Sequence, residues 1–191
     1  MAELILIRHA RSEHGAALAG RRDVPARRPP RALLEAVRAE IGEVDLLVAS
    51  PALRCRQSCA WLFGTDADRL EPALWEQDFG AWEGRAFADL PEEGALPRRD
   101  LARMTPPGGE SFAALYARCA PVLERLGSSP ARRVAVIAHA GTVRAGLSLA
   151  LGQIEAGLAF SVDNLSVTRI ARAGDAWAIL SVNRRGRAAE W

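Results

Sequence analysis

Two uninterrupted apolar runs, residues 4–7 and 134–138, each end in a polar turn that contains a histidine. Runs without polar alternation predict strands that are buried on both faces, as in the middle of a parallel sheet. The first run is followed by Arg8 and His9, and the second by His139. Because ligands of open α/β sheets bind at the carboxyl ends of the strands, these side chains are expected at a functional edge.

Helical and strand patterns alternate along the rest of the chain. Apolar spacing and end signals predict helices over residues 31–41, 51–63, 112–126 and 142–151. Further strands are predicted over residues 45–49, 70–75, 165–170 and 177–182, with a hairpin turn at 173–175 between the last two. This alternation predicts an α/β fold, a three-layer sandwich with a mainly parallel central sheet and helices on both faces.

The second helix is expected to begin at the carboxyl end of the strand over residues 45–49. Ser50 can cap this helix and Pro51 suits its first turn. Arg54 then lies in the first turn, although a cation there is unfavourable against the helix dipole. Since a helix N-terminus is already an anion site, the placement indicates that Arg54 serves an anion.

Two irregular segments are expected near the functional edge. Residues 12–30 are rich in Gly, Arg and Pro and have no periodic pattern. They form either a solvated connection or a basic rim of the site, and the sequence favours neither. Residues 85–108 hold short helical pieces broken by prolines, which predicts a small flap or cap over the site. We interpret residues 1–191 as a single domain with this flap as an insertion.

Composition narrows the class of protein. The 191 residues are 49% hydrophobic and 25% charged, as in ordinary globular domains. No apolar run is long enough to span a membrane and no signal peptide is evident, so we expect a cytoplasmic protein without a membrane partner. All 25 basic residues are arginines, scattered among 23 acids, which argues against a nucleic-acid partner. The three cysteines are expected to be reduced. The sequence is compatible with a homodimer and does not decide the oligomeric state.

Predicted strand ends supply a set of chemically active side chains: Arg8, His9, Arg54, Glu76 and His139. Such a set could bind a metal or a phosphate group. Histidines at the close helical spacing of metal sites are absent, and the arginines would repel a cation. Phosphoryl transfer fits better, because imidazole can attack phosphorus, arginines neutralise the transferring group and a carboxyl can protonate the leaving alkoxide. We therefore expect chemistry on a small phosphorylated substrate, without a metal or another cofactor.

Five sequence blocks follow one another along most of the chain: LIRH, SPALR, EQDFGAWEG, PGGES and AHAGTVR. Together they resemble the histidine phosphatase superfamily, in its phosphoglycerate-mutase-like branch. The resemblance implies a phosphoglycerate mutase-like fold and a metal-independent phosphomonoesterase that acts through a phosphohistidine intermediate. It implies His9 as the phosphorylated nucleophile and Glu76 as the proton donor, with Glu83 as the alternative donor.

The resemblance also implies a phosphate pocket and substrate contacts. These comprise Arg8, Arg11, Ser12, Arg54, His139 and Ala140. Three positions near the expected nucleophile depart from the family pattern: Ala10, Arg11 and Gly15 stand where many members carry Gly, Glu and Asn. A fourth departure is Ala140, which follows the second histidine in place of Gly. None of these departures removes a proposed catalytic group, but they bear on substrate identity and rate.

Within the family, the blocks at residues 78–84 and 106–111 look most like those of α-ribazole phosphatases. These enzymes remove the 5′-phosphate of α-ribazole phosphate in cobalamin biosynthesis. A broad-specificity histidine phosphatase or a phosphoglycerate mutase-type enzyme shares the blocks and stays an alternative. From another class, a non-catalytic phosphate-binding or regulatory module on the same fold also stays open, since the three departures lie close to the nucleophile.

Overall fold

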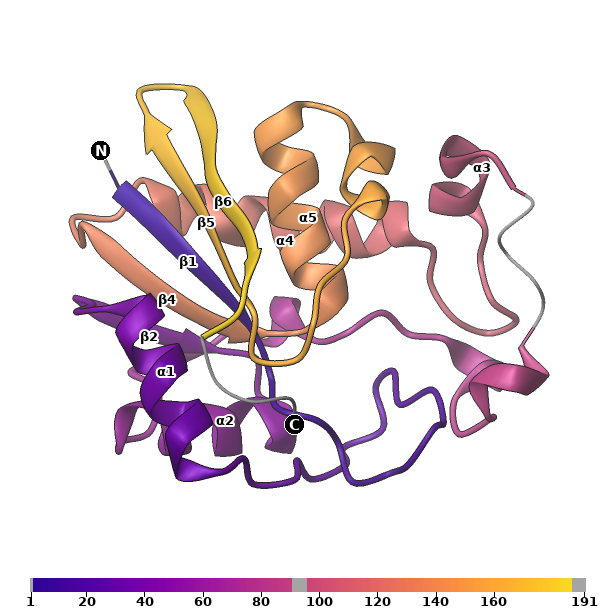
Figure 1. Ribbon diagram of the computed structural model, residues 1–191. Coiled ribbons are helices and arrows are strands. Elements are labelled where there is room, and N and C mark those ends of the chain that lie inside the picture. The colour runs from indigo at the N-terminus through magenta and orange to yellow at the C-terminus, as the bar shows by residue number, and fades with distance from the viewer. Residues whose placement is uncertain (1, 91–95, 187–191) are drawn as a thin grey trace.

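The computed structural model describes residues 2–90 and 96–186, and in this part of the chain a six-stranded sheet forms the centre (Figure 1). Its strands are β1 (Ala2–Arg8), β2 (Leu46–Ala49), β3 (Arg69–Leu70), β4 (Arg133–Ala138), β5 (Val167–Ala173) and β6 (Ala176–Arg184). They lie in the order β3-β2-β4-β1-β5-β6. Neighbours from β3 to β1 run parallel, and β5 runs antiparallel to both β1 and β6. The predicted α/β fold with a mainly parallel sheet is confirmed.

Helices cover both faces of the sheet (Figure 1). The longer ones are α1 (Arg31–Ile41), α2 (Leu53–Phe63), α4 (Phe112–Gly127) and α5 (Ala140–Leu151). Shorter helical segments are η1 (Pro72–Leu74), η2 (Gly80–Trp82), η3 (Phe87–Asp89), α3 (Arg98–Arg103) and η5 (Ile154–Ala159). The pair α1 and α2 packs on one face of the sheet, and the pair α4 and α5 packs on the other.

Strand β1 divides the hydrophobic core into two halves. Successive side chains of a strand point to opposite faces. Leu4 and Leu6 therefore pack with the residues of α4 and α5, whereas Ile5 and Ile7 pack with those of α1 and α2. All four side chains are buried, at 1% exposure or less. The aliphatic run at residues 4–7 is thus explained by a strand covered on both faces.

The strand predicted over residues 70–75 is shorter in the structure. Only Arg69 and Leu70 pair with β2, and η1 follows from Pro72. Proline has no backbone N–H to offer a ladder, and its fixed φ suits the first turn of a helix. The prediction of a strand to Trp75 was wrong for this reason.

Two helix starts also differ from the prediction. Helix α2 begins at Leu53 after Ala52, which has no capping side chain. The hydroxyl of Ser50 lies 2.9 Å from Nε2 of His139, and the N–H of Leu53 donates instead to the carboxylate of Asp23 at 2.7 Å. Helix α5 begins at Ala140, two residues earlier than predicted, with His139 at its N-cap position.

The flap predicted at about residues 85–108 falls partly on residues 91–95, which lie outside the described residues. Its described parts hold η3 and α3, and a β-bridge joins Ala86 to Ala17. The three cysteines are buried free thiols, as expected. None of the helices within residues 2–90 and 96–186 is long and apolar enough to cross a membrane.

Candidate active site

The carboxyl ends of β1, β2 and β4 bring three of the expected side chains together. His9 directly follows β1, His139 directly follows β4, and Arg54 lies in the first turn of α2 after β2. The ring centroids of the two histidines are 5.1 Å apart. Nε of Arg54 lies 3.3 Å from Nε2 of His9, and its Nη2 lies 3.2 Å from Nδ1 of His139. The topology thus places these groups where open α/β sheets bind ligands.

The ring of His9 is held in one tautomer. Its Nδ1 lies 2.7 Å from the carbonyl oxygen of Ala10, which can only accept a hydrogen bond, so Nδ1 carries the proton and Nε2 carries the lone pair. Burial, followed by the positive charge of Arg54, holds the pKa of His9 well below its ordinary value. His9 is therefore neutral at pH 7, and its Nε2, which accepts from Nε of Arg54 at 3.3 Å, is the ring nitrogen that can act as a nucleophile.

Arg54 is fixed by backbone oxygens of the loop at residues 12–30. Its side chain is 1% exposed. Nη1 donates to the carbonyl of Arg22 at 2.9 Å and Nη2 to the carbonyl of Gly20 at 2.7 Å. This loop therefore forms part of the site. Of the two interpretations of residues 12–30, the structure supports a rim of the site and not a mere solvated connection.

His139 lies behind Arg54. Arginine only donates, so Nδ1 of His139 accepts from Arg54 and its Nε2 donates to Ser50. Burial lowers the pKa of His139 well below its ordinary value, and the positive charge of Arg54 acts in the same direction. The indole of Trp75 lies nearly parallel to this imidazole, at 11° and 6.3 Å between centroids. A neutral, fully buried His139 thus braces Arg54.

Arg8 supplies a second cation beside His9. Its Nη1 donates to the carbonyl of Val162 at 2.6 Å. Its buried Nε has no hydrogen-bond partner among the described residues. Burial lowers the pKa of Arg8, and the negative charge of Glu76 opposes that effect. Arg8 lines the cavity, so its positive charge favours an anionic oxygen there.

The two candidate proton donors lie in different places. Glu76 lines the cavity next to His9, and its Oε1 accepts from the N–H groups of Gln77 at 2.9 Å and Gly141 at 3.2 Å. A Cβ atom at Gly141 would overlap Glu76 Oε1, so glycine is required for this approach. Glu83 accepts from the backbone of Arg21 at 2.8 Å instead and is not among the cavity residues.

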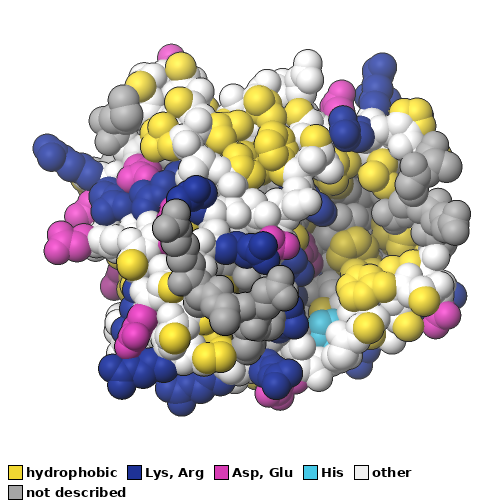
Figure 2. Space-filling view, in the orientation of Figure 1, with side chains coloured by type: hydrophobic (Ala, Val, Ile, Leu, Met, Phe, Trp, Pro, Cys, Tyr) yellow, Lys and Arg dark blue, Asp and Glu magenta, His cyan; other side chains and the backbone are white. Residues whose placement is uncertain are grey.

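A cavity of about 380 Å³ opens in front of these groups. Its residues are Arg8, His9, Arg11, Ser12, His14, Gly15, Ala17, Leu18, Ala19, Gly20, Arg54, Glu76, Gln77, Phe79, Phe87, Phe112, Ala140, Gly141, Arg144, Leu158 and Asn164. Figure 2 shows a hollow on this face with hydrophobic side chains along one wall and basic side chains along another. Every expected site residue lines the cavity except His139, which lies behind it.

The departure at Ala10 leaves the geometry intact. Among the described non-glycine residues, positive φ angles occur at Leu165 and Asn183 and not at Ala10, so this turn does not require glycine. The N–H of Ala10 donates to the hydroxyl of Ser58 at 2.9 Å. The methyl group is fully buried and the carbonyl still orients His9.

Sequence reasoning missed three contributors to the site: Ser58, Arg144 and Asn164. The amide of Asn164 donates to the carbonyl of His9 at 2.9 Å, and Arg144 lines the cavity. Arg144 stood in the AHAGTVR block and could have been found there. Asn164 lies in a loop before β5 with no local signal, and only the pairing of β5 with β1 brings it to His9.

No cluster of three or more His, Cys, Asp or Glu side chains suited to a metal ion occurs within the described ranges. The charged groups that face the cavity are instead mainly arginines, which favour an anion.

Comparison with known proteins identifies the family. The model of the histidine phosphatase superfamily (branch 1) matches residues 4–185. The bifunctional protein Rv2228c of Mycobacterium tuberculosis is 40% identical over 87 residues, covering 43% of this chain and 24% of that protein. The chain thus matches only about a quarter of the length of this curated relative.

Solved structures share the fold over nearly the whole chain. The mycobacterial glucosyl-3-phosphoglycerate phosphatase Rv2419c, solved with VO3, has a TM-score of 0.81 and 26% identity, covering 96% of this chain and 99% of that chain. A putative alpha-ribazole-5'-P phosphatase from Escherichia coli K-12 has a TM-score of 0.81 and 22% identity, covering 99% of each chain. With a family model that spans residues 4–185, the chain belongs to the histidine phosphatase superfamily.

Proposed function

We propose that the protein is a metal-independent phosphomonoesterase with His9 as its nucleophile. The observation that carries the proposal is the tautomer of His9, whose protonated Nδ1 faces the carbonyl of Ala10 at 2.7 Å. Its Nε2 lone pair is thereby directed to the side of Arg54, in a cavity that also presents Arg8. A neutral imidazole in a cavity lined by two guanidinium groups is suited to attack the phosphorus of a bound phosphate ester.

In the first step, Nε2 of His9 attacks phosphorus and the ester P–O bond breaks. The electron pair of that bond stays on the leaving oxygen, which takes a proton from the carboxyl group of Glu76. Arg8 and Arg54 stabilise the charge on the equatorial oxygens. The products are an alcohol and phosphohistidine at His9.

In the second step, the carboxylate of Glu76 takes a proton from a water molecule, which attacks phosphorus as the P–N bond breaks. His9 recovers its lone pair and inorganic phosphate leaves. His139 lies behind the phosphate pocket, where its Nδ1 accepts from Arg54 and so fixes the direction of that guanidinium. Ala140, Arg11 and Ser12 lie on the cavity wall and serve as substrate contacts.

The first substrate to test is α-ribazole 5′-phosphate. Besides its arginines, the cavity is lined by apolar side chains, namely Leu18, Phe79, Phe87, Phe112 and Leu158. Such a lining suits a leaving alcohol with an aromatic part. The resemblance to a putative alpha-ribazole-5'-P phosphatase supports this substrate. The greater identity to a glucosyl-3-phosphoglycerate phosphatase makes glucosyl-3-phosphoglycerate the second candidate.

The test is phosphate release from a panel of phosphomonoesters in the presence of a metal chelator. The panel contains both candidates, phosphoglycerates, sugar phosphates and a nitrophenyl ester. We expect turnover by the wild-type protein, unchanged by chelation, and none by His9→Ala that folds normally. Absence of turnover across the panel by folded protein that binds phosphate would instead support a non-catalytic binding module.

A further inference from the structure

The backbone of residues 73–76, here termed the donor segment, carries Glu76 without support from a neighbouring strand. Pairing of β3 with β2 ends at Leu70. The four carbonyl oxygens of the donor segment accept hydrogen bonds from side chains of α4 and α5 instead. Arg118 donates to the carbonyls of residues 73, 75 and 76, and Thr142 donates to that of residue 74. Helix side chains therefore hold this segment in place.

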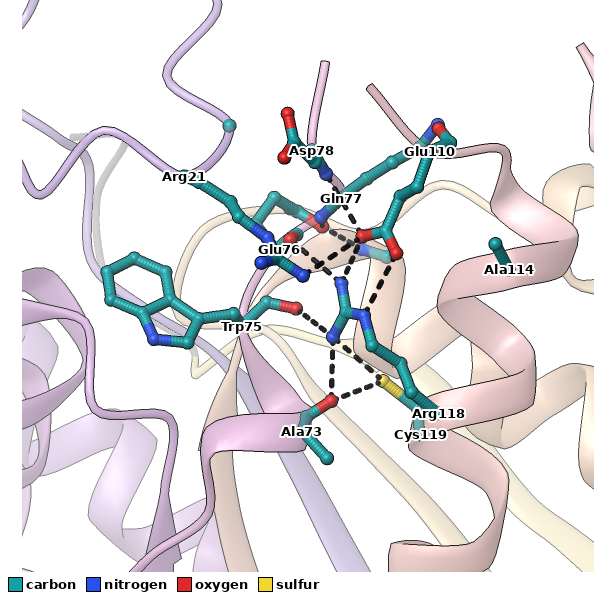
Figure 3. A network of polar contacts seen from close by, with 12 residues as sticks. Arg21, Ala73, Trp75, Glu76, Gln77, Asp78, Glu110, Ala114, Arg118 and Cys119 are labelled. Atoms are coloured by element: carbon teal, nitrogen blue, oxygen red, sulfur yellow. Dashed lines mark hydrogen bonds and ion pairs between the residues drawn. The ribbon is translucent and has the colours of Figure 1, made fainter. Parts of the chain in front are cut away.

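Arg118 uses all five of its N–H groups. Nη1 lies 2.7 Å from the carbonyl oxygens of both Ala73 and Trp75, and Nη2 lies 2.9 Å from that of Glu76. The remaining two N–H groups reach the carboxylate of Glu110, with Nε at 3.1 Å from its Oε2 and Nη2 on its Oε1. Figure 3 shows the guanidinium between this carboxylate and the donor segment. Lysine cannot reproduce such a planar five-donor arrangement.

Glu110 fixes the same region from a second side. Its Oε1 accepts from the N–H of Asp78 at 3.1 Å, and its own N–H donates to the carbonyl of Asp78 at 2.8 Å. Burial by itself raises the pKa of Glu110, but hydrogen bonds from Arg118 and Asp78 outweigh it and hold the pKa below its ordinary value. The side chains of Arg118 and Glu110 are only 20% and 17% exposed. The pair is therefore ionised and rigid at neutral pH.

We propose that Arg118, oriented by Glu110, is a positioning residue that aims the proton donor Glu76 at the leaving oxygen. It holds the Glu76 carbonyl, while the Glu76 side chain reaches the cavity and the N–H of Gly141 at 3.2 Å. This inference rests on the proposed function. Its consequence is specific: loss of Arg118 impairs proton donation to a leaving group that needs a proton, and spares one that does not.

The test compares kcat/KM for two esters, since kcat/KM reports the step in which the leaving group departs. One ester is the best alkyl phosphate of the substrate panel, and the other is para-nitrophenyl phosphate, whose phenolate leaves without a proton. For Arg118→Met we expect a loss of about 100-fold on the alkyl ester and less than about fivefold on the nitrophenyl ester. Arg118→Lys keeps the charge but not the geometry, and is expected to give the same pattern.

Arg125 on the same helix provides the matched control. It forms an ion pair with Glu71 at 2.8 Å and its side chain is 54% exposed. Arg125→Met is expected to leave both values unchanged. If Arg118→Met does not fold, Glu110→Gln is tested in its place, because it keeps the shape of the partner side chain. The same comparison is made, between the loss in kcat/KM on the alkyl ester and that on the nitrophenyl ester. Equal losses on both esters, or no loss, would overturn the inference.

A double variant separates this inference from the proposed function. Glu76→Gln alone is expected to show the leaving-group pattern, and Glu76→Gln with Arg118→Met to add no further loss on the alkyl ester. If Glu76→Gln lacks the pattern, the assignment of the proton donor fails. If Glu76→Gln loses more activity on the alkyl ester than on the nitrophenyl ester, and the Arg118 variants do not, only the positioning role of Arg118 is rejected.

Discussion

At the scale of single residues, Arg54 is the group whose exact chemical type matters most. Its Nε, Nη1 and Nη2 reach His9, Arg22 and Gly20 at 3.3, 2.9 and 2.7 Å, and no single ammonium can satisfy that fork. We expect Arg54→Lys to lower kcat/KM by about 100-fold or more. Steady-state kinetics checks this, with Arg56→Lys as the control, since Arg56 is exposed on the same helix. Equal activity of the two variants would contradict the role of Arg54.

The strand-end residues could be predicted because each follows an apolar run that is visible in the sequence. His9 and His139 each follow an apolar run that must lie inside the sheet, so their place at one edge follows from the fold class. No such sequence pattern precedes Asn164 or Ser58. Asn164 approaches His9 through the pairing of β5 with β1, and Ser58 approaches Ala10 through the packing of α2. These contacts depend on tertiary structure alone.

At the scale of elements, α2 begins with a cap borrowed from the loop at residues 12–30. Asp23 accepts from the N–H of Leu53 at 2.7 Å, whereas the hydroxyl of Ser50 contacts His139 and the N–H of Ala52. We expect Asp23→Ala to lower the free energy of unfolding by about 1 kcal/mol, the usual cost of a lost cap. Urea denaturation measures it. Asp66→Ala, at an exposed carboxylate just beyond α2, should change stability by less than about 0.5 kcal/mol, and an equal loss there would refute the borrowed cap.

The donor segment shows why one element could not be predicted. The sequence from Leu70 to Trp75 is compatible with a strand, but its hydrogen bonds are made by Arg118 and Thr142, which lie more than forty residues further along the chain. Such partners leave no local pattern. Helix α4, in contrast, was predicted almost to the residue, because the hydroxyl of Ser111 caps it by accepting from the N–H of Ala114 at 3.1 Å.

At the scale of the whole molecule, the two buried histidines make stability depend on pH. Burial lowers the pKa of both His9 and His139 well below 6.5, so the folded protein keeps them neutral while the unfolded chain takes up protons. The free energy of unfolding should therefore fall as the pH drops from 7 toward 5. Each histidine contributes up to about 1.4 kcal/mol per pH unit below its unfolded pKa.

Urea denaturation between about pH 7.5 and 5.5 checks this expectation. In His139→Gln the decline should be shallower, because one of the two groups is gone. Glu110 does not interfere, since its pKa lies below 4.5 and its contribution is lost only at lower pH. An equal slope in the variant, or greater stability at low pH, would contradict the account of neutral buried histidines.

The central claim is that His9 carries the phosphoryl group during turnover. The most direct measurement is acid-free rapid quenching of the wild-type protein with substrate, followed by mass spectrometry of the peptide that contains His9. The account predicts a phosphoramidate on His9 that forms and decays at rates consistent with turnover and is absent from His9→Ala. Turnover with no modification of His9, or with the phosphoryl group on another residue, would contradict it.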